Sequence, residues 1–188
     1  MKLIIINYGA GNTQSVKFAL QRLGINPVLS SDKEELLSAD KIIFPGVGHA
    51  KAAMDVLKEK ELDSLIPQLK QPVLGICLGM QLMCKFSEEG NTPCLGIFDE
   101  TVQLFEPKAK VPHIGWNLSH NNASGDVAYY YFVHSYYVPK NQFTTSTCRY
   151  ITEFSAAMQK KNFYAVQFHP EKSGVAGERM LQKFLQSK

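Results

Sequence analysis

One pentapeptide restricts the fold of this 188-residue chain more than any other segment. It reads Gly75-Ile76-Cys77-Leu78-Gly79 and directly follows the apolar residues Val73 and Leu74. Glycines two positions before and two positions after the cysteine permit the sharp turn and the close strand–helix contact of a nucleophile elbow. Because such a turn joins a buried strand to a helix, we expect an α/β fold in which Cys77 stands at the end of a strand.

Strand-like and helix-like segments alternate through the first half of the chain. Short apolar runs predict the strands, and apolar residues at helical spacing predict the helices. We expect strands at 2–6, 25–29, 41–44 and 73–76. We expect helices at 13–23, at 50–69 with a break at Pro67, and at 78–86. A further short helix should end at residue 37 and begin at a capping box formed by Ser31 and Glu34. Such alternation with short connections predicts a mainly parallel, doubly wound sheet with helices on both faces.

The second half of the chain has few helical segments. We expect strands at 99–106, 128–134, 143–150, 155–159 and 163–168, a hairpin turn at 160–162 and a closing helix at 176–185. No repeat, low-complexity segment or linker divides the chain. The sequence therefore predicts a single domain over 1–188, with an antiparallel extension of the parallel sheet.

A thiol nucleophile needs a general base, and the base needs a third group that fixes its tautomer. Of the five histidines, His169 fits best because it ends a predicted strand and is followed by Pro170 and Glu171. Strand ends at the rim of an open α/β sheet are where such folds bind ligands. We expect one ring nitrogen of His169 to point toward the Cys77 sulfur and the other to meet Glu171.

Composition excludes several other classes of function. The net charge of +3 is small and the lysines are scattered, which argues against a nucleic-acid partner. The apolar run at 3–6 is too short for a signal peptide or a membrane span, so we expect a cytoplasmic protein with no membrane contact. The cysteines at 77, 84, 94 and 148 lack zinc-site spacing, and we expect no metal, no cofactor and, apart from Cys77, buried free thiols.

Two segments, 75–81 and 167–173, together resemble the class I (triad) glutamine amidotransferases. Three more, at 7–12, 45–48 and 112–117, resemble the amidotransferase subunits of imidazole glycerol phosphate synthases, which serve histidine biosynthesis. The resemblance extends from Asn7 to Ser173 and implies a flavodoxin-like amidotransferase fold. The polar segment 119–126 matches no signature.

The resemblance implies a role for each residue that matches a motif. Cys77 would attack the carboxamide of L-glutamine and form a thioester, His169 would move the proton, and Glu171 would orient His169. The N–H of Leu78 would face the oxyanion. Gln81, one helical turn beyond the nucleophile, would hold the glutamine head group.

Two further segments would complete the site. Val47 and Gly48 resemble the oxyanion strand, and we expect the peptide between them to rotate into place when an occupied partner is bound. The segment 131–136, with Ser135 and Tyr136, resembles the wall of the glutamine site and the subunit boundary. The implied partner is a (β/α)₈-barrel cyclase, bound as a heterodimer, that uses the ammonia to make imidazole glycerol phosphate and a purine-pathway ribonucleotide.

Other readings remain open on the sequence alone. A paralogous subunit serving a synthase of surface-sugar biosynthesis would carry the same catalytic motifs. A stand-alone thiol esterase with the same elbow would place an Asp between nucleophile and base and would not need Glu171. In a binding or structural module, the Cys, His and Glu constellation would have no role.

Overall fold

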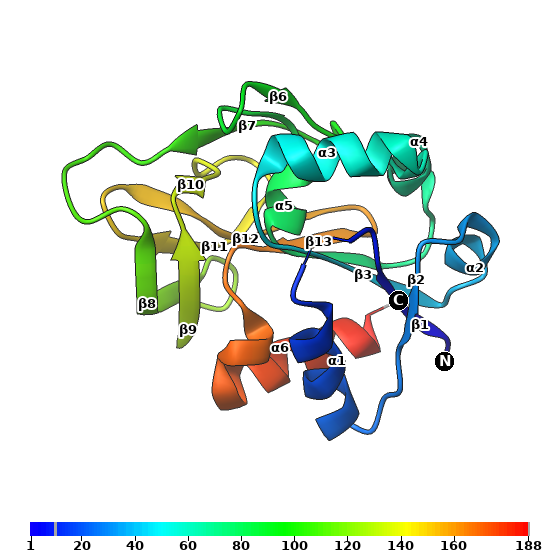
Figure 1. Ribbon diagram of the computed structural model, residues 1–188. Coiled ribbons are helices and arrows are strands. Elements are labelled where there is room, and N and C mark those ends of the chain that lie inside the picture. Colours follow the sequence, from blue (N-terminus) through cyan, green and yellow to red (C-terminus); the bar gives the residue numbers. More distant parts are fainter. Residues whose placement is uncertain (10, 188) are drawn as a thin grey trace.

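The computed structural model describes residues 1–9 and 11–187 and is built around a twisted nine-stranded sheet (Figure 1). The strand order is β2-β1-β3-β4-β13-β12-β11-β8-β9. The parallel part comprises β2 (Val28–Ser30), β1 (Leu3–Ile6), β3 (Lys41–Gly46), β4 (Val73–Cys77) and β13 (Phe163–Val166). The antiparallel part comprises β12 (Glu153–Lys160), β11 (Thr144–Arg149), β8 (His113–Asn121) and β9 (Val127–His134). The predicted doubly wound fold with an antiparallel extension is confirmed.

Helices cover both faces of the parallel strands (Figure 1). On one face lie α1 (Thr13–Arg22) and α6 (Gly174–Gln186), and on the other lie α3 (Ala50–Glu59), α4 (Leu62–Leu65) and α5 (Leu78–Leu82), with α2 (Lys33–Leu37) at the edge. Strand β1 divides its side chains between two apolar cores: Ile4 and Ile6 join the α3 side, whereas Leu3 and Ile5 join the α1 and α6 side. Burial on both faces explains why these strands are continuous apolar runs.

A second, four-stranded sheet was not expected from the sequence. Its order is β10 (Tyr136–Tyr137), β7 (Phe98–Leu104), β5 (Cys84–Ser87) and β6 (Thr92–Pro93). The helix predicted at 78–86 is therefore wrong beyond Leu82. Cys84 pairs with Phe98 and Ser87 pairs with Val102, so partners that are distant in sequence override the local helical tendency.

Three other predicted details are wrong. The break in the helix predicted at 50–69 falls at Glu61, in left-handed conformation at φ 54°, whereas Pro67 lies in the first turn of a short 3₁₀ helix, η1 (Ile66–Gln68), where proline is tolerated. The cap of α2 is Asp32, which accepts a 2.9 Å hydrogen bond from the N–H of Glu35, and not Ser31. Strand β2 begins at Val28, later than expected.

The uninformative segment 119–126 forms the end of β8 and the turn into β9. Strand β8 itself was not predicted, and it pairs with β9 over eight residue pairs from His113↔His134 to His120↔Val127. Of the segment 7–12, Ala10 lies outside the described residues. In the described part of the chain, no helix is long and apolar enough to cross a membrane.

Candidate active site

The elbow at Cys77 is formed by close contact between β4 and α5. Cys77 has φ 54° and ψ −111°, a backbone conformation that non-glycine residues rarely adopt and that folds preserve mainly at functional sites. A Cβ on Gly79 would lie 1.9 Å from the carbonyl oxygen of Phe44, and one on Gly75 would lie 2.9 Å from the Met83 sulfur. Only glycine fits at these two positions, which is the physical reason for the Gly-x-Cys-x-Gly pattern.

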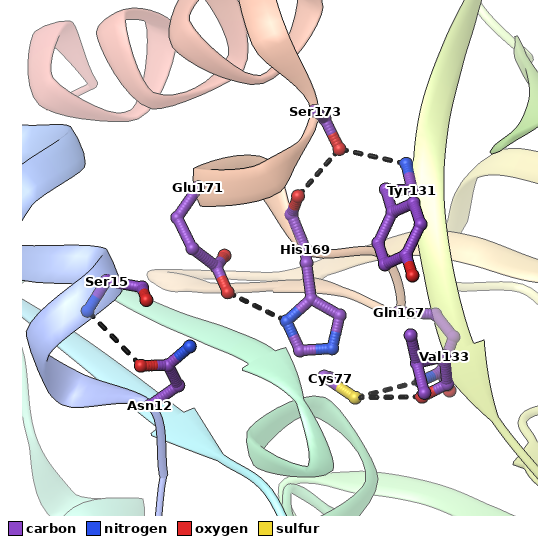
Figure 2. A network of polar contacts seen from close by, with 9 residues as sticks. All are labelled: Asn12, Ser15, Cys77, Tyr131, Val133, Gln167, His169, Glu171 and Ser173. Atoms are coloured by element: carbon purple, nitrogen blue, oxygen red, sulfur yellow. Dashed lines mark hydrogen bonds and ion pairs between the residues drawn. The ribbon is translucent and has the colours of Figure 1, made fainter. Parts of the chain in front are cut away.

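His169 lies beside the elbow because β13 pairs directly with β4, with Val166 opposite Ile76. It caps the 3₁₀ helix η2 (Pro170–Lys172), whose turn brings Glu171 back so that its Oε1 lies 2.8 Å from Nδ1 of His169 (Figure 2). Burial of the ring lowers the pKa of His169, but hydrogen bonds and charges of Cys77 and Glu171 outweigh it and raise the pKa to about 10. The site therefore favours the protonated, imidazolium form of His169.

The turn that carries His169 is fixed to β9. The N–H of His169 donates to the carbonyl of Tyr131 (2.9 Å), and the Ser173 hydroxyl donates to the carbonyl of His169 (2.6 Å) while accepting from the N–H of Tyr131 (2.9 Å) (Figure 2). The second carboxylate oxygen of Glu171 is buried without a hydrogen-bond partner among the described residues. Within residues 1–9 and 11–187, His169 is thus the one hydrogen-bonded partner of that carboxylate, which strengthens its hold on the imidazole proton.

The thiol of Cys77 faces two groups that the sequence did not single out. Its Sγ lies 3.8 Å from the carbonyl oxygen of Val133 and 3.7 Å from Nε2 of Gln167. The Sγ atom also interacts with the ring of His169, and this hydrogen bond and charge contribute to the raised pKa of that ring. The expected contact of His169 with Glu171 is present, whereas the thiol is turned toward the β9 side (Figure 2).

Gln167 belongs to a buried pair of amides beneath the site. Nε2 of Gln81 donates to Oε1 of Gln167 and to the carbonyl of Tyr136, at 2.9 Å each. Gln167 is fully buried and Gln81 nearly so. One signal for Gln167 was available in the sequence, because a glutamine in the apolar run 163–168 needs buried polar partners.

A cavity of about 340 Å³ brings most of the predicted residues together. Eight of the nine candidates line it: Val47, Gly48, Cys77, Leu78, Gln81, Ser135, Tyr136 and His169. Glu171 lies behind His169, beside a small void that has no room for a water molecule. Of the other five lining residues, Val133 and His134 belong to the segment 131–136 that was expected to form a wall of the site, whereas Glu89, Pro112 and Lys172 were not singled out.

One side of the cavity is formed by Val47 and Gly48, which directly follow β3. Gly48 has φ +104°, and no atom lies within 4 Å of the place where its Cβ would be. Val47 is exposed, whereas the preceding Pro45 is held by the buried hydroxyl of Tyr8, which donates to its carbonyl at 3.1 Å. Burial, followed by the charge of Cys77, raises the pKa of Tyr8 and keeps this hydroxyl protonated.

The remaining cysteines have no part in the cavity. All four cysteines are free thiols, with Cys84 and Cys148 buried and Cys94 only partly buried, so the expected full burial of Cys94 is wrong. Burial raises the pKa of Cys94 and of Cys148 to about 12. In residues 1–9 and 11–187, no group of three or more His, Cys, Asp or Glu side chains is placed to hold a metal ion.

A larger cavity of about 830 Å³ lies between α6 and the outer strands, away from these groups. None of the predicted residues lines it. Its lining includes small residues such as Ala128 and Ala157. Size alone therefore does not mark the site, and the convergence of nucleophile, base and polar groups favours the smaller cavity.

Comparison with known families and proteins gives one consistent result. The family model for glutamine amidotransferase class-I matches residues 4–187. The protein named imidazole glycerol phosphate synthase subunit HisH from Bacteroides fragilis is 57% identical over 195 aligned positions, covering 99% of this chain and 100% of the relative. The Escherichia coli protein of the same name is 48% identical with the same coverage.

Solved structures agree at the level of the fold. A structure described as a glutamine amidotransferase superimposes with a TM-score of 0.78 at 18% identity, covering 97% of each chain. A structure of PurLQS from Thermotoga maritima gives a TM-score of 0.71 at 18% identity, covering 98% of this chain and 97% of that chain. At this identity the likeness concerns the fold alone.

Proposed function

The chain belongs to the class-I glutamine amidotransferase family, and on that premise we propose that Cys77, His169 and Glu171 hydrolyse L-glutamine to glutamate and ammonia. The observation that carries this proposal is the position of His169, which is hydrogen-bonded to Glu171 at 2.8 Å and lines the same cavity as Cys77. A thiolate next to an imidazolium is the reactive form of a cysteine nucleophile.

The proposed reaction proceeds in two halves. The Cys77 thiolate attacks the carboxamide carbon of glutamine, and His169 donates its proton to the leaving nitrogen as the carbon–nitrogen bond breaks. This releases ammonia and leaves a γ-glutamyl thioester. A water molecule then attacks the thioester while His169 accepts its proton, and glutamate leaves as the Cys77 thiolate is restored beside a protonated His169.

The cavity offers groups of both signs for a free amino acid. The carboxylate of Glu89 is held by the N–H of Ala50 at 2.7 Å, and Lys172 lines the cavity as well. We propose that Glu89 binds the α-ammonium and Lys172 the α-carboxylate. The Gln81 amide has both of its donor hydrogens engaged, which leaves its oxygen for the substrate.

We propose that the oxyanion is stabilised by the N–H of Leu78 and by the peptide between Val47 and Gly48. The open space around Gly48 and its positive φ support a rotation of that peptide, because glycine tolerates both signs of φ. An occupied partner would then activate the enzyme without moving His169. Equal glutamine turnover in the free chain, in the complex and in the substrate-loaded complex would contradict this switch.

The relatives in Bacteroides fragilis and Escherichia coli support a subunit role in imidazole glycerol phosphate synthase, and hence in histidine biosynthesis. We propose that the partner is a (β/α)₈-barrel cyclase that receives the ammonia in a 1:1 complex. The proposed single domain spans 1–188. A cytoplasmic location remains a prediction from the short apolar run at 3–6.

The outer face of the β8–β9 hairpin is the proposed docking surface. Ile114, Trp116 and Tyr129 are each more than half exposed on it. Val133, which pairs with Ile114, reaches the cavity, so this surface borders the site of ammonia release. Trp116→Glu should weaken binding of the barrel subunit, whereas Leu37→Glu, at an equally exposed position on α2, should leave it unchanged.

The deciding experiment compares Cys77→Ala with Cys94→Ala in the reconstituted two-subunit enzyme. Cys77→Ala should abolish the glutamine-dependent reaction while free ammonia still supports product formation. Cys94→Ala should keep both activities, because Cys94 lies outside the cavity. Glutamine-dependent turnover by Cys77→Ala would falsify the assignment, and hydrolysis of simple esters in preference to glutamine would favour a thiol esterase.

A further inference from the structure

The sequence motif at 112–117 contains His113 and Asn117, two polar residues that the proposed reaction does not use. His113 on β8 lies opposite His134 on β9, and the two rings are 3% and 6% exposed. Nδ1 of His113 lies 3.0 Å from Nε2 of His134. Two buried imidazoles in direct contact need a defined arrangement of protons, because one nitrogen must donate where the other accepts.

The protons of this pair follow from their neighbours. Nδ1 of His134 lies 2.7 Å from the carbonyl oxygen of Tyr136, which only accepts, so His134 carries its proton on Nδ1. Burial, together with the charges of His113 and His169, lowers the pKa of His134 to about 3 despite that hydrogen bond. Its Nε2 is therefore unprotonated and must accept the Nδ1 proton of His113.

The outer end of the chain of hydrogen bonds is Asn117. Burial lowers the pKa of His113 to about 4, so its Nε2 accepts from the Asn117 amide nitrogen at 3.2 Å. That amide is oriented by two further contacts, since its oxygen accepts from the N–H of Leu118 (2.8 Å) and its nitrogen donates to the carbonyl of Arg149 (3.0 Å). Gly115, at φ +135° between the two residues, has a backbone conformation that residues with a Cβ rarely adopt.

The inner end reaches the nucleophile. The carbonyl of Tyr136 accepts from His134 and from Gln81, and Gln81 uses its second amide hydrogen on Gln167. Because the oxygen of Gln167 is engaged in this way, its nitrogen is directed at Cys77 Sγ, 3.7 Å away. Every donor between Asn117 and Cys77 is thus assigned by the structure.

We propose that Asn117, His113 and His134 form a hydrogen-bond relay of fixed polarity that positions the Tyr136 carbonyl and, through Gln81, the Gln167 amide that faces Cys77. These are positioning residues, because none of the three touches Cys77. On the proposed function, the relay also has a regulatory consequence. Asn117 lies next to Trp116 on the strand that presents the docking surface, so a partner that shifts β8 acts on the Cys77 thiolate through the relay.

The first test needs no substitution. In the full-length wild-type chain, ¹⁵N spectra of histidine should show His113 and His134 as neutral rings protonated on Nδ1. A neutral ring protonated on Nε2 at either position would overturn the relay. The titratable groups that face the pair are His169 and Tyr150, and the spectra should be recorded near neutral pH.

The second test reverses the polarity at the outer end. Asn117→Asp has the same shape, but a carboxylate only accepts, so Nε2 of His113 must now carry a proton. The matched control is Asn122→Asp in the same hairpin, where an exposed amide that donates to the Thr144 carbonyl receives the same charge. Each variant loses one hydrogen bond to a backbone carbonyl: Asn122→Asp the one to Thr144, and Asn117→Asp the one to Arg149. Only Asn117 belongs to the relay.

The readouts are glutamine turnover in the two-subunit enzyme and the rate at which iodoacetamide alkylates Cys77. Relative to Asn122→Asp, Asn117→Asp should lower both by roughly tenfold at about pH 8, within the range seen for network residues that contact no ligand. The loss should be smaller at about pH 6, where His113 is able to hold both protons. Rates equal to the control would overturn the proposal.

Failure of the proposed function would look different. If wild type, Asn122→Asp and Asn117→Asp all lack glutamine turnover, the glutaminase assignment fails. The ring tautomers and the alkylation rates would still test the relay. Cys84, Cys94 and Cys148 do not interfere, because burial raises the pKa of each and disfavours its thiolate.

Discussion

The side-chain amides of Gln81 and Gln167 face each other beneath the elbow, with 2.9 Å between the Gln81 nitrogen and the Gln167 oxygen. Both are buried, so neither group can exchange its partner for water. Gln167→Met should therefore lower the free energy of unfolding by about 1–3 kcal/mol, because it leaves one Gln81 hydrogen without an acceptor. Urea denaturation would measure this.

A double substitution tests the same pair more sharply. Gln81→Met together with Gln167→Met removes donor and acceptor at once, so its cost in unfolding free energy should be less than the sum of the two single costs. Strictly additive costs would show that the two amides do not interact.

Gly79→Ala should distort the elbow, because the new Cβ would lie 1.9 Å from the Phe44 carbonyl oxygen. Gly24→Ala is the matched control: it has φ +79° but no atom within 4 Å, so it should cost only about 1–2 kcal/mol of left-handed strain. We expect Gly79→Ala to lose more stability than the control and to lose glutamine turnover. Equal denaturation midpoints with full activity would contradict the packing argument.

Glu171→Gln should lower the pKa of His169, which is about 10 in the native site against an ordinary value of 6.5. A raised folded-state pKa stabilises the protein fully below about pH 6.5, and this contribution is lost as the pH rises toward 10. The variant should therefore have a lower free energy of unfolding than wild type below about pH 6.5, and this difference should shrink as the pH rises toward 10. Carbon-13 titration of His169 and urea denaturation at several pH values would both report it.

His134 should make the protein sensitive to acid. Its pKa is about 3 in the fold against 6.5 ordinarily, so between these values the unfolded chain binds more protons and stability falls as the pH is lowered. His134→Gln should reduce the number of protons taken up on unfolding in this pH range by about one. His120→Gln, an exposed histidine on the same hairpin, should not. Identical acid profiles for the two variants would argue against a buried neutral His134.

Local chemistry explains which parts of the structure were visible in the sequence. The elbow could be found because Gly75 and Gly79 are required within one pentapeptide, and the parallel strands could be found because burial on both faces leaves continuous apolar runs. Strand β5 could not, since its conformation depends on pairing with β7 and not on its own residues. The residues at 84–87 therefore resembled a continuation of α5.

The candidate site shows the same division. Cys77, His169 and Glu171 were found because each has a recognisable neighbour within two residues. Glu89 and Lys172 were missed because they become neighbours of Cys77 only when segments from different elements meet around the cavity. His134 was noted within 131–136, but its contact with His113 depends on the β8–β9 pairing, which the sequence did not predict.

The pairing of β4 with β13 also has a consequence for the order of events during protein synthesis. On the proposed function, the nucleophile Cys77 is translated about ninety positions before the base His169, and β13, which pairs with β4 on that side, leaves the ribosome after β4. A nascent chain that lacks β13 therefore carries Cys77 without the base that the proposed function assigns to it. On the proposed function, glutamine is not hydrolysed until β13 has docked, and chains truncated before β13 should be inert toward it.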